Sequence, residues 1–465
     1  MQKYTSFYNF LKTAAEKYGD KTAVLYDTFE ASYRKLFEDS VKKALHFERF
    51  DGDRIAVYGP ASYRWIVNLF GTVLAGKDAA VVDFFIPHDV RFKMIEKINV
   101  DYVLCSTNQY ILSDNKGIII DGAENDNVEE LEYNPEGKKE GRILFFTATS
   151  QECDKAVVLT AQNILGAVFN ISSRCRCGEK DRVLAQIELS NTFGLVFSLM
   201  WPLANGACVC VGRGLRHIDS DTYYYNPTIL PANPSVAEYL KKIKGFNSEL
   251  KSIIIGEAPC PYHLYEALRD RDINVCTVYG SAESTGCIAI NYAEDGSYEP
   301  FEDGTVSLSE DGEILLSGSC VMEGYDNDKT ATDEKLKGGF LHTGDYGRLN
   351  STGRIVITHR NPDIILLPTG AQVCRNVIND EITSISGIAE SCIIYYEDKL
   401  TAVITPIDKA ARPDRFKRRI DKYNDEKGYR WEIQRVVISA SKLPRNYDGS
   451  VDISAVETLI DESDS

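Results

Sequence analysis

The sequence contains no apolar run long enough to cross a membrane. A spanning helix needs about 18 or more consecutive apolar residues, and no stretch of this 465-residue chain approaches that length. Residues 1–21 mix charges with apolar residues at helical spacing, which is not the pattern of a signal peptide or an anchor. We therefore expect a cytoplasmic protein that does not bind membranes.

Positive charge is also scarce. The chain has 52 Lys and Arg against 69 Asp and Glu, a formal net charge of −17 and a pI near 5.0. A nucleic-acid surface requires clustered Lys and Arg. The densest basic segment, residues 412–422, alternates with acidic and apolar residues as an exposed helix face does. This balance excludes nucleic acid as an expected partner.

The cysteines lack the spacings of disulfide-rich or zinc-binding proteins. The 12 cysteines are scattered, no Cys-x-x-Cys pair occurs, and only 6 histidines are present. None of these histidines lies near a cysteine pair at zinc-site spacing. We expect reduced, mostly buried thiols and no structural zinc.

Short apolar strands alternate with helical segments along most of the chain. Residues 53–59 and 78–84 read as strands, and residues 60–76 between them read as a helix that begins at a proline and ends at a glycine. This alternation is typical of βαβ units with a largely parallel sheet. The pattern repeats as a second layer to about residue 300, and a chain of this length exceeds one hydrophobic core.

The pattern changes after residue 300. An Asp-Gly turn within residues 304–318 predicts a hairpin, and residues 346–360 repeat the form. The fold class is therefore α/β: a large N-terminal domain of layered α/β sheets over residues 1–360, with a β-rich subdomain at about 300–360. A smaller α+β domain over residues 361–465 follows it.

Several segments, in their order along the chain, carry a resemblance to a known family. They are ILFFTATSQECDKAVVLT, GEAPCP, VYGSAESTG, GEILLSGSCVMEGY, FLHTGDYGRL, HRNPDIILLPTGAQV and LPRNYDGSVD. In this order they resemble the adenylate-forming (AMP-binding) superfamily of acyl-CoA synthetases, peptide-synthetase adenylation domains and luciferases, as a divergent member. The resemblance implies attack of a carboxylate on the α-phosphate of ATP, followed by acyl transfer to a thiol or amine.

The resemblance assigns roles to the segment YGSAEST. Tyr279 matches the residue that flanks the adenine, followed by Gly280. Ser281 or Thr285 is the implied hydrogen-bond donor to phosphate. Glu283 matches the Mg²⁺ ligand, a role that suits a hard carboxylate oxygen.

The resemblance also implies which positions form the nucleoside half of the site. Asp345 matches the acid that accepts hydrogen bonds from the ribose hydroxyls. Arg360 matches the arginine that supports the ribose or phosphate side. Gly256, Glu257 and Ala258 match a loop whose backbone lies along the adenine.

The phosphate loop departs from the family pattern. Thr147, Thr149, Ser150 and Lys155 are its matching hydroxyls and lysine, but the family's loop glycines and proline are absent. Acidic residues occupy positions 152 and 154 instead. One such charge about 4 Å from a phosphate charge costs on the order of 4 kcal/mol at an effective dielectric of 20.

Three more positions depart from the pattern. Ser450 stands where the family has a catalytic lysine, and loss of one preorganised donor costs roughly 3–4 kcal/mol in the transition state. Pro362 stands at the hinge, where its fixed φ hinders domain rotation. Asn191 occupies a position at which many members have an aromatic residue or histidine gating the acyl tunnel.

Two hypotheses follow from this resemblance. The first is an ATP-dependent acyl- or aryl-adenylating ligase, with Lys155, Glu283 and Arg360 as catalytic residues and Glu283 as the metal ligand. Its cofactors are ATP/AMP and Mg²⁺, its substrate a small carboxylic acid, and its acceptor coenzyme A or the phosphopantetheine of an acyl carrier protein. The second is a catalytically impaired relative that binds nucleotide or acyl-adenylate, or acts as a partner subunit.

Overall fold

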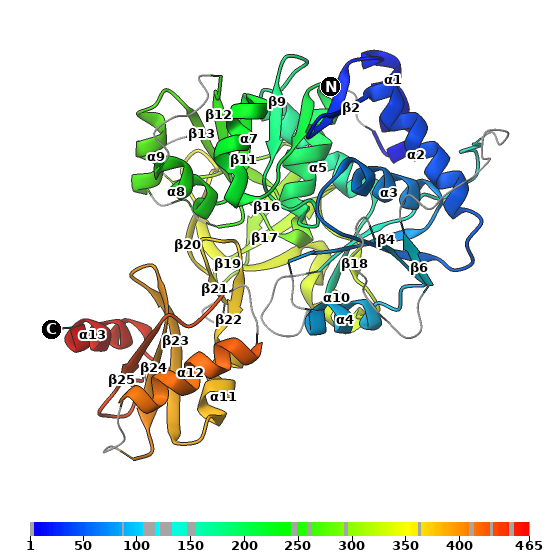
Figure 1. Ribbon diagram of the computed structural model, residues 1–465. Helices are drawn as coiled ribbons and strands as arrows, with labels where there is room; N and C mark the ends of the chain where they lie inside the picture. The colour runs from blue at the N-terminus through cyan, green and yellow to red at the C-terminus, as the bar shows by residue number, and fades with distance from the viewer. Residues whose placement is uncertain are drawn as a thin grey trace. The chain divides into compact units, whose positions relative to one another are not determined.

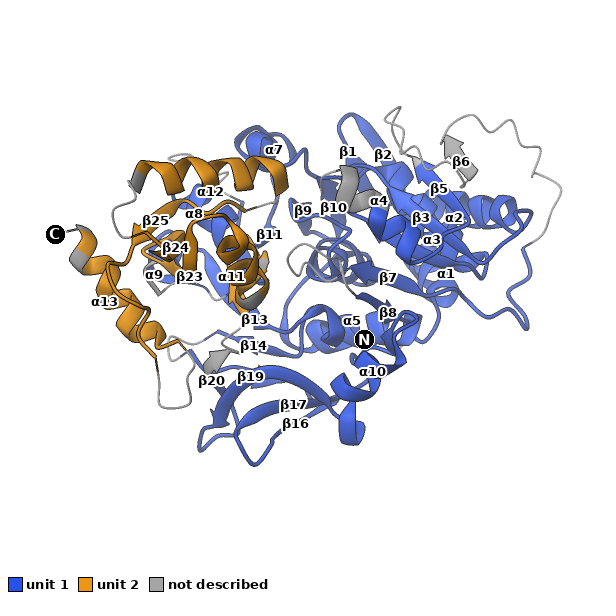
Figure 2. Cartoon of the chain, turned by 90° about the horizontal axis from the view of Figure 1, so that it is seen from below, with its two compact units in different colours: residues 1–147, 154–359 blue, residues 148–153, 360–465 orange. Residues whose placement is uncertain are grey.

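The chain forms two compact units, and among the described residues the first ends at His359 and the second begins at Arg360 (Figure 2). The computed structural model describes residues 4–85, 88–105, 117–120, 133–146, 155–242, 249–258, 260, 262–292, 296–360, 364–408, 413–427, 431–445 and 451–464. Within this part no helix is long and apolar enough to cross a membrane.

The first unit contains two large sheets (Figure 1). The larger has the order β15 (Glu299–Pro300), β14 (Ala289–Asn291), β13 (Asn274–Tyr279), β12 (Ser252–Ile255), β11 (Ile229–Ala232), β9 (Arg182–Ala185), β10 (Cys208–Val211), β1 (Thr22–Tyr26) and β2 (Phe29–Ser32). From β13 to β1 all neighbours are parallel, and antiparallel strands lie at both edges. The expected layered α/β fold is confirmed.

The second sheet contains the strand that follows Lys155. Its order is β18 (Gly324–Tyr325), β8 (Ala156–Leu159), β7 (Ile143–Phe146), β4 (Asp78–Val82), β3 (Arg54–Tyr58), β5 (Tyr102–Cys105) and β6 (Gly117–Ile120). Strands β7 to β6 are parallel, whereas β8 and β18 are antiparallel additions. The two-residue strand β18 thus lies at the edge of this sheet beside β8.

Helix α3 (Tyr63–Leu74) packs against β3 and β4 and is buried over nearly its whole surface. Its N-cap is Ser62, whose hydroxyl accepts the Trp65 N–H, so the helix starts a little after the predicted Pro60. The other helices of this unit are α1 (Phe7–Tyr18), α2 (Tyr33–Phe47), α4 (His88–Lys97), α5 (Ala161–Arg174), α6 (Trp201–Ala204), α7 (Ile218–Tyr225), α8 (Pro234–Lys242), α9 (Tyr262–Arg269) and α10 (Lys329–Lys335).

The β-rich part of the first unit is a four-stranded sheet. Its order is β16 (Gly304–Leu308), β17 (Glu313–Gly318), β19 (Leu341–Leu349) and β20 (Ile355–Arg360). The predicted hairpin over residues 304–318 is formed by antiparallel β16 and β17. Tyr279 of β13 packs into the small apolar core of this sheet, so the sheet borders one end of the larger one.

The second unit has its own hydrophobic core, formed around Ile393, Ile404, Phe416 and Ile420. A hairpin of β21 (Ile364–Leu366) and β22 (Gln372–Cys374) precedes a sheet of β23 (Ile388–Tyr396), β24 (Lys399–Pro406) and β25 (Arg435–Ile438). Its helices are α11 (Arg375–Ser384), α12 (Pro413–Lys427) and α13 (Ile453–Asp464).

Candidate active site

The carboxyl ends of parallel strands bring most of the expected nucleotide residues to one edge of the larger sheet. Ala232, Ile255 and Thr277 are register partners across β11, β12 and β13. The segments that follow these strands begin at Asn233, Gly256 and Gly280 and therefore start at nearly the same level. In open α/β sheets ligands bind at this edge.

Gly256 is fixed here by a close approach to Phe193. A Cβ at this position would lie 2.4 Å from Cε2 of the Phe193 ring, so only glycine fits without movement of the ring. Glu257 follows with a positive φ of 68°, and its Oε2 accepts a hydrogen bond from Asn233 Nδ2 at 3.1 Å. The loop from Gly256 to Ala258 therefore has a defined path beside the ends of the strands.

The segment after β13 folds back on itself and fixes Glu283. Gly280 lies against the backbone of Cys287, since a Cβ would be 2.7 Å from Cys287 Cα. The turn continues into a short 3₁₀ helix, Ala282–Ser284, and the Gly286 N–H closes it on the Ser281 carbonyl at 2.8 Å. Glu283 therefore projects from a compact turn at the sheet edge.

Thr285 has a structural role in this turn. It is fully buried in the left-handed conformation with φ of 55°, and its hydroxyl donates to the Cys320 carbonyl at 2.5 Å. Its one hydroxyl proton is thus engaged by backbone. Of the two hydroxyls expected as phosphate donors, Ser281 is the one that remains partly exposed at the turn.

Glu283, Tyr325 and Lys155 form a small polar cluster. The Tyr325 hydroxyl donates to Glu283 Oε1 at 2.8 Å, and Lys155 Nζ lies 5.0 Å from the centre of the Tyr325 ring. Burial, with the negative charge of Glu283 as the next cause, raises the pKa of Tyr325 far above its ordinary value. The tyrosine consequently stays protonated and remains a donor to the carboxylate.

Asp345 is held by a second tyrosine. The Tyr279 hydroxyl donates to Asp345 Oδ2 at 2.9 Å, although the two residues are 66 positions apart. The segment that carries Asp345 is organised by Glu313, whose carboxylate contacts His342 Nδ1 and accepts the Gly344 N–H, both at 2.8 Å. These contacts orient one carboxylate oxygen of Asp345 toward Tyr279.

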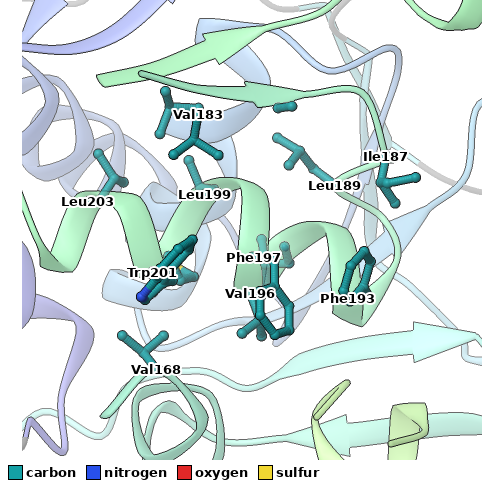
Figure 3. Close-up of a cluster of buried hydrophobic side chains, with 14 of the residues drawn as sticks. Val168, Val183, Ile187, Leu189, Phe193, Val196, Phe197, Leu199, Trp201 and Leu203 are labelled. Carbon is teal, nitrogen blue, oxygen red and sulfur yellow. The ribbon is translucent and has the colours of Figure 1, made fainter. Parts of the chain in front are cut away.

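Asn191 has a helix-capping contact. Its Oδ1 accepts the Phe193 N–H at 2.8 Å at the start of a helix that continues as the π-helix Gly194–Met200 (η1). An aromatic stripe follows this helix, with ring centres 4.8 Å apart for Phe193 and Phe197 and 6.2 Å apart for Phe197 and Trp201 (Figure 3). A π-helix is rare and frequently marks a functional site.

Several expected site residues lie outside the described residues. These are Thr147, Thr149, Ser150, Pro362 and Ser450. Arg360 is the last residue of β20 and the first described residue of the second unit.

The donor set at Glu283 fits one Mg²⁺ that is shared with phosphates. In the described part of the chain no three His, Cys, Asp or Glu side chains gather as a metal cluster. Mg²⁺ at nucleotide sites is typically bound by one or two carboxylates together with substrate phosphates and water. Glu283 supplies one such carboxylate, and Lys155 lies over the ring of Tyr325, which donates to that carboxylate.

Sequence reasoning missed three residues that shape this site: Tyr325, Glu313 and Phe193. Tyr325 and Glu313 both lie within the motif GEILLSGSCVMEGY, which contributed to the resemblance but received no site role. The presence of a conspicuous polar residue at each end of this motif was the available signal.

Comparison with known proteins decides the family. A sequence model described as AMP-binding enzyme matches residues 11–326, which is more than half of the chain. The chain belongs to the AMP-binding enzyme family. Glu283 and Lys155 both lie within the matched residues, whereas Asp345 and the second unit lie beyond them.

Relatives in this AMP-binding family are CoA ligases of low identity. The chain is 22% identical to 2-succinylbenzoate–CoA ligase of Bacillus cereus over 98% of each protein. It is 26% identical to an octahydroindenyl-propanoyl:CoA ligase of Mycobacterium tuberculosis, over 66% of this chain and 64% of that ligase. The corresponding ligase of Rhodococcus jostii is 23% identical over 95% of this chain and 96% of its own length.

Solved structures share the fold of this AMP-binding chain. A double mutant of o-succinylbenzoate CoA synthetase from Bacillus subtilis, bound to a product analogue, aligns with a TM-score of 0.79 at 17% identity, over 97% of this chain and 98% of that chain. The same synthetase with ATP and magnesium ion has a TM-score of 0.70 at 19% identity, over 98% and 99%. The amide bond synthetase McbA from Marinactinospora thermotolerans has a TM-score of 0.77 at 17% identity, over 97% and 99%.

Proposed function

We propose that this protein is an ATP-dependent ligase that activates a small acyl or aryl carboxylic acid as its adenylate. The observation that carries the proposal is the cluster in which Tyr325 holds one oxygen of Glu283 and Lys155 lies over the same ring. A carboxylate beside a lysine at the end of a parallel sheet is suited to a metal-bound polyphosphate. Membership of the AMP-binding family supports this assignment.

In the proposed reaction, an oxygen of the substrate carboxylate bonds to the α-phosphorus of ATP and the bond to pyrophosphate breaks. Glu283 holds Mg²⁺, which when bound neutralises charge that develops on the phosphates. Lys155 adds a second positive charge near them. Ser281 donates a hydrogen bond to a phosphate oxygen, as do Thr147, Thr149 and Ser150.

The nucleoside half of the proposed site is formed by the other positions to which the resemblance assigns a role. Asp345, fixed by Tyr279, accepts hydrogen bonds from the ribose hydroxyls. Gly256 to Ala258 lie along the adenine beside Tyr279, and Arg360 binds the ribose or phosphate side.

We propose coenzyme A as the acyl acceptor, because the relatives named above are CoA ligases. A carrier-protein phosphopantetheine offers the same thiol chemistry, and an acyl carrier protein is therefore the alternative partner. Both acceptors are found in the cytoplasm, which we propose as the location of this protein.

Two features of the sequence favour a second function. Ser450 replaces a lysine that the family places on the α-phosphate, and the phosphate loop lacks glycines and carries two acids. Loss of one such donor alone lowers the rate by about 10²–10³. The alternative is therefore an adenylate-binding protein with little or no turnover.

Calorimetric titration with ATP and, separately, AMP, each with Mg²⁺, distinguishes the two functions. A ligase binds ATP at least as tightly as AMP and releases pyrophosphate with a suitable acid, and Glu283→Ala abolishes that release. A binding protein prefers AMP, and Ser450→Lys then creates or raises pyrophosphate release. Absence of binding to both nucleotides would refute both functions.

A further inference from the structure

We propose that Tyr325 is a positioning residue that orients the carboxylate of Glu283 for Mg²⁺ binding. This inference rests on the proposed function and deepens it, because it assigns a role to a residue that received none from the resemblance. Among the described residues, the hydrogen bond to Glu283 Oε1 is the contact that fixes this carboxylate. The second oxygen, Oε2, is thereby presented to a ligand.

Tyr325 belongs to a segment that contacts Glu283 at two points. The Met322 N–H donates to the Glu283 main-chain carbonyl at 2.8 Å, and three residues later the Tyr325 hydroxyl donates to its side chain. A residue bound through both its main chain and its side chain has little rotational freedom. Glu283 is thus oriented relative to one short segment, residues 322–325.

That segment is itself fixed to the sheet that carries Lys155. Strand β18 pairs with β8, and the Asp326 N–H donates to the Ala156 carbonyl at 2.8 Å. The Tyr325 N–H is satisfied by Thr332 Oγ1 at 2.9 Å. Lys155 directly precedes Ala156, the first residue of β8. Tyr325 therefore stands at a fixed position relative to Lys155.

Asp326 anchors the same segment from its other side. Its two carboxylate oxygens accept from Arg54 at 2.8 and 2.9 Å, in a paired geometry that restricts rotation as well as translation. The position of Tyr325 is thus fixed by the pairing of β18 with β8 and by the ion pair between Arg54 and the next residue, Asp326. Such support makes a tyrosine suitable for holding a catalytic carboxylate at a defined angle.

The Tyr325 contact acts on a metal ligand through a hydrogen bond, and loss of partners of this kind typically weakens metal binding about 10–100-fold. The test uses full-length protein with Mn²⁺ and a non-hydrolysable ATP analogue. Free Mn²⁺ is measured by electron paramagnetic resonance. The variants are Tyr325→Phe, Glu283→Gln and the double variant, with Tyr33→Phe as the control.

Tyr33 is a matched control because it is buried in the same unit and its hydroxyl donates to the Ala207 carbonyl at 2.7 Å. We expect Tyr325→Phe to weaken Mn²⁺ binding about 10-fold or more, and Tyr33→Phe to bind as the wild type does. In the Glu283→Gln background, Tyr325→Phe should cause no further loss, because the carboxylate through which it acts is absent.

Two results overturn the inference while leaving the proposed function intact. One is Mn²⁺ binding by Tyr325→Phe that equals that of Tyr33→Phe, while Glu283→Gln binds weakly. The other is a loss in the double variant equal to the sum of both single losses, which indicates a general structural effect. A wild type that takes up no Mn²⁺ with the analogue refutes the metal role of Glu283 and, with it, the proposed function.

Discussion

The ion pair between Arg54 and Asp326 should contribute much more stability than a nearby exposed pair of the same length. Both Asp326 and Asp333 line one hollow beside β18. Asp326 is 2.8 Å from Arg54, and Asp333 is 2.8 Å from Lys329. The side chains of the first pair are 15% and 7% exposed, whereas those of the second are 85% and 62% exposed. The variants Asp326→Asn and Asp333→Asn therefore test the effect of burial on ion pairs that have the same N–O distance.

The expected magnitudes differ severalfold. Breaking a buried pair by removing one partner costs about 3–5 kcal/mol because a buried charge is left uncompensated. Arg54 keeps the Ile98 carbonyl and Asp78 at 3.8 Å, so the lower end applies and Asp326→Asn should cost about 3 kcal/mol. An exposed i,i+4 pair contributes about 0.3–0.5 kcal/mol, which is the loss expected for Asp333→Asn.

Urea unfolding followed by tryptophan fluorescence measures both losses. Of the 3 tryptophans, Trp65 and Trp201 lie in the first unit and Trp431 in the second. A Trp431→Phe background restricts the signal to the unit under test. With a slope of about 3 kcal/mol per M urea, the Asp326→Asn midpoint should fall by about 1 M. Equal midpoint shifts for the two variants would refute the reasoning that burial decides the strength of these pairs.

Two further predictions concern packing and pH. Gly256→Ala places a methyl group against the Phe193 ring and should lower the free energy of unfolding by about 1–3 kcal/mol. Gly178→Ala is the control, because a Cβ there meets nothing within 4 Å, and it should cause no loss in the same urea titration. Equal losses for the two variants would contradict the packing argument. Burial raises the pKa of the Cys392 thiol from 9.0 to about 11. Its stabilising contribution is therefore fully present below pH 9 and is lost as the pH rises through about 11. Between pH 8 and pH 10 the free energy of unfolding of the wild type should fall by about 1 kcal/mol more than that of Cys392→Ala, as measured by urea unfolding at both pH values. Equal decreases in the two proteins would show that the thiol pKa is not raised.

The elements with a clear apolar period were predicted well from sequence. Strand β4 begins at the expected Asp78, and β3 lies within the expected residues 53–59. Local signals decide such elements, because a short apolar run between a glycine-containing turn and a buried helix has few other conformations. The π-helical hydrogen bonding of Gly194–Met200 was not predicted, because an apolar run of this length does not distinguish a π-helix from an α-helix.

The sequence by itself determined the family and predicts the residue types of the proposed nucleotide site. The order of the motifs around Glu283 and Asp345 was sufficient to identify the family. The departures at Ser450 and in the phosphate loop could also be read from the sequence, because residue identity at a motif position is a local property.

Only the tertiary structure decided which partners hold those residues. Tyr325 lies 42 positions from Glu283, and Tyr279 lies 66 positions from Asp345. Parallel strands align their carboxyl ends across the larger sheet, and the edge strand β18 brings a distant tyrosine beside β8. Such pairings depend on strand order and register, which no local pattern in the chain specifies.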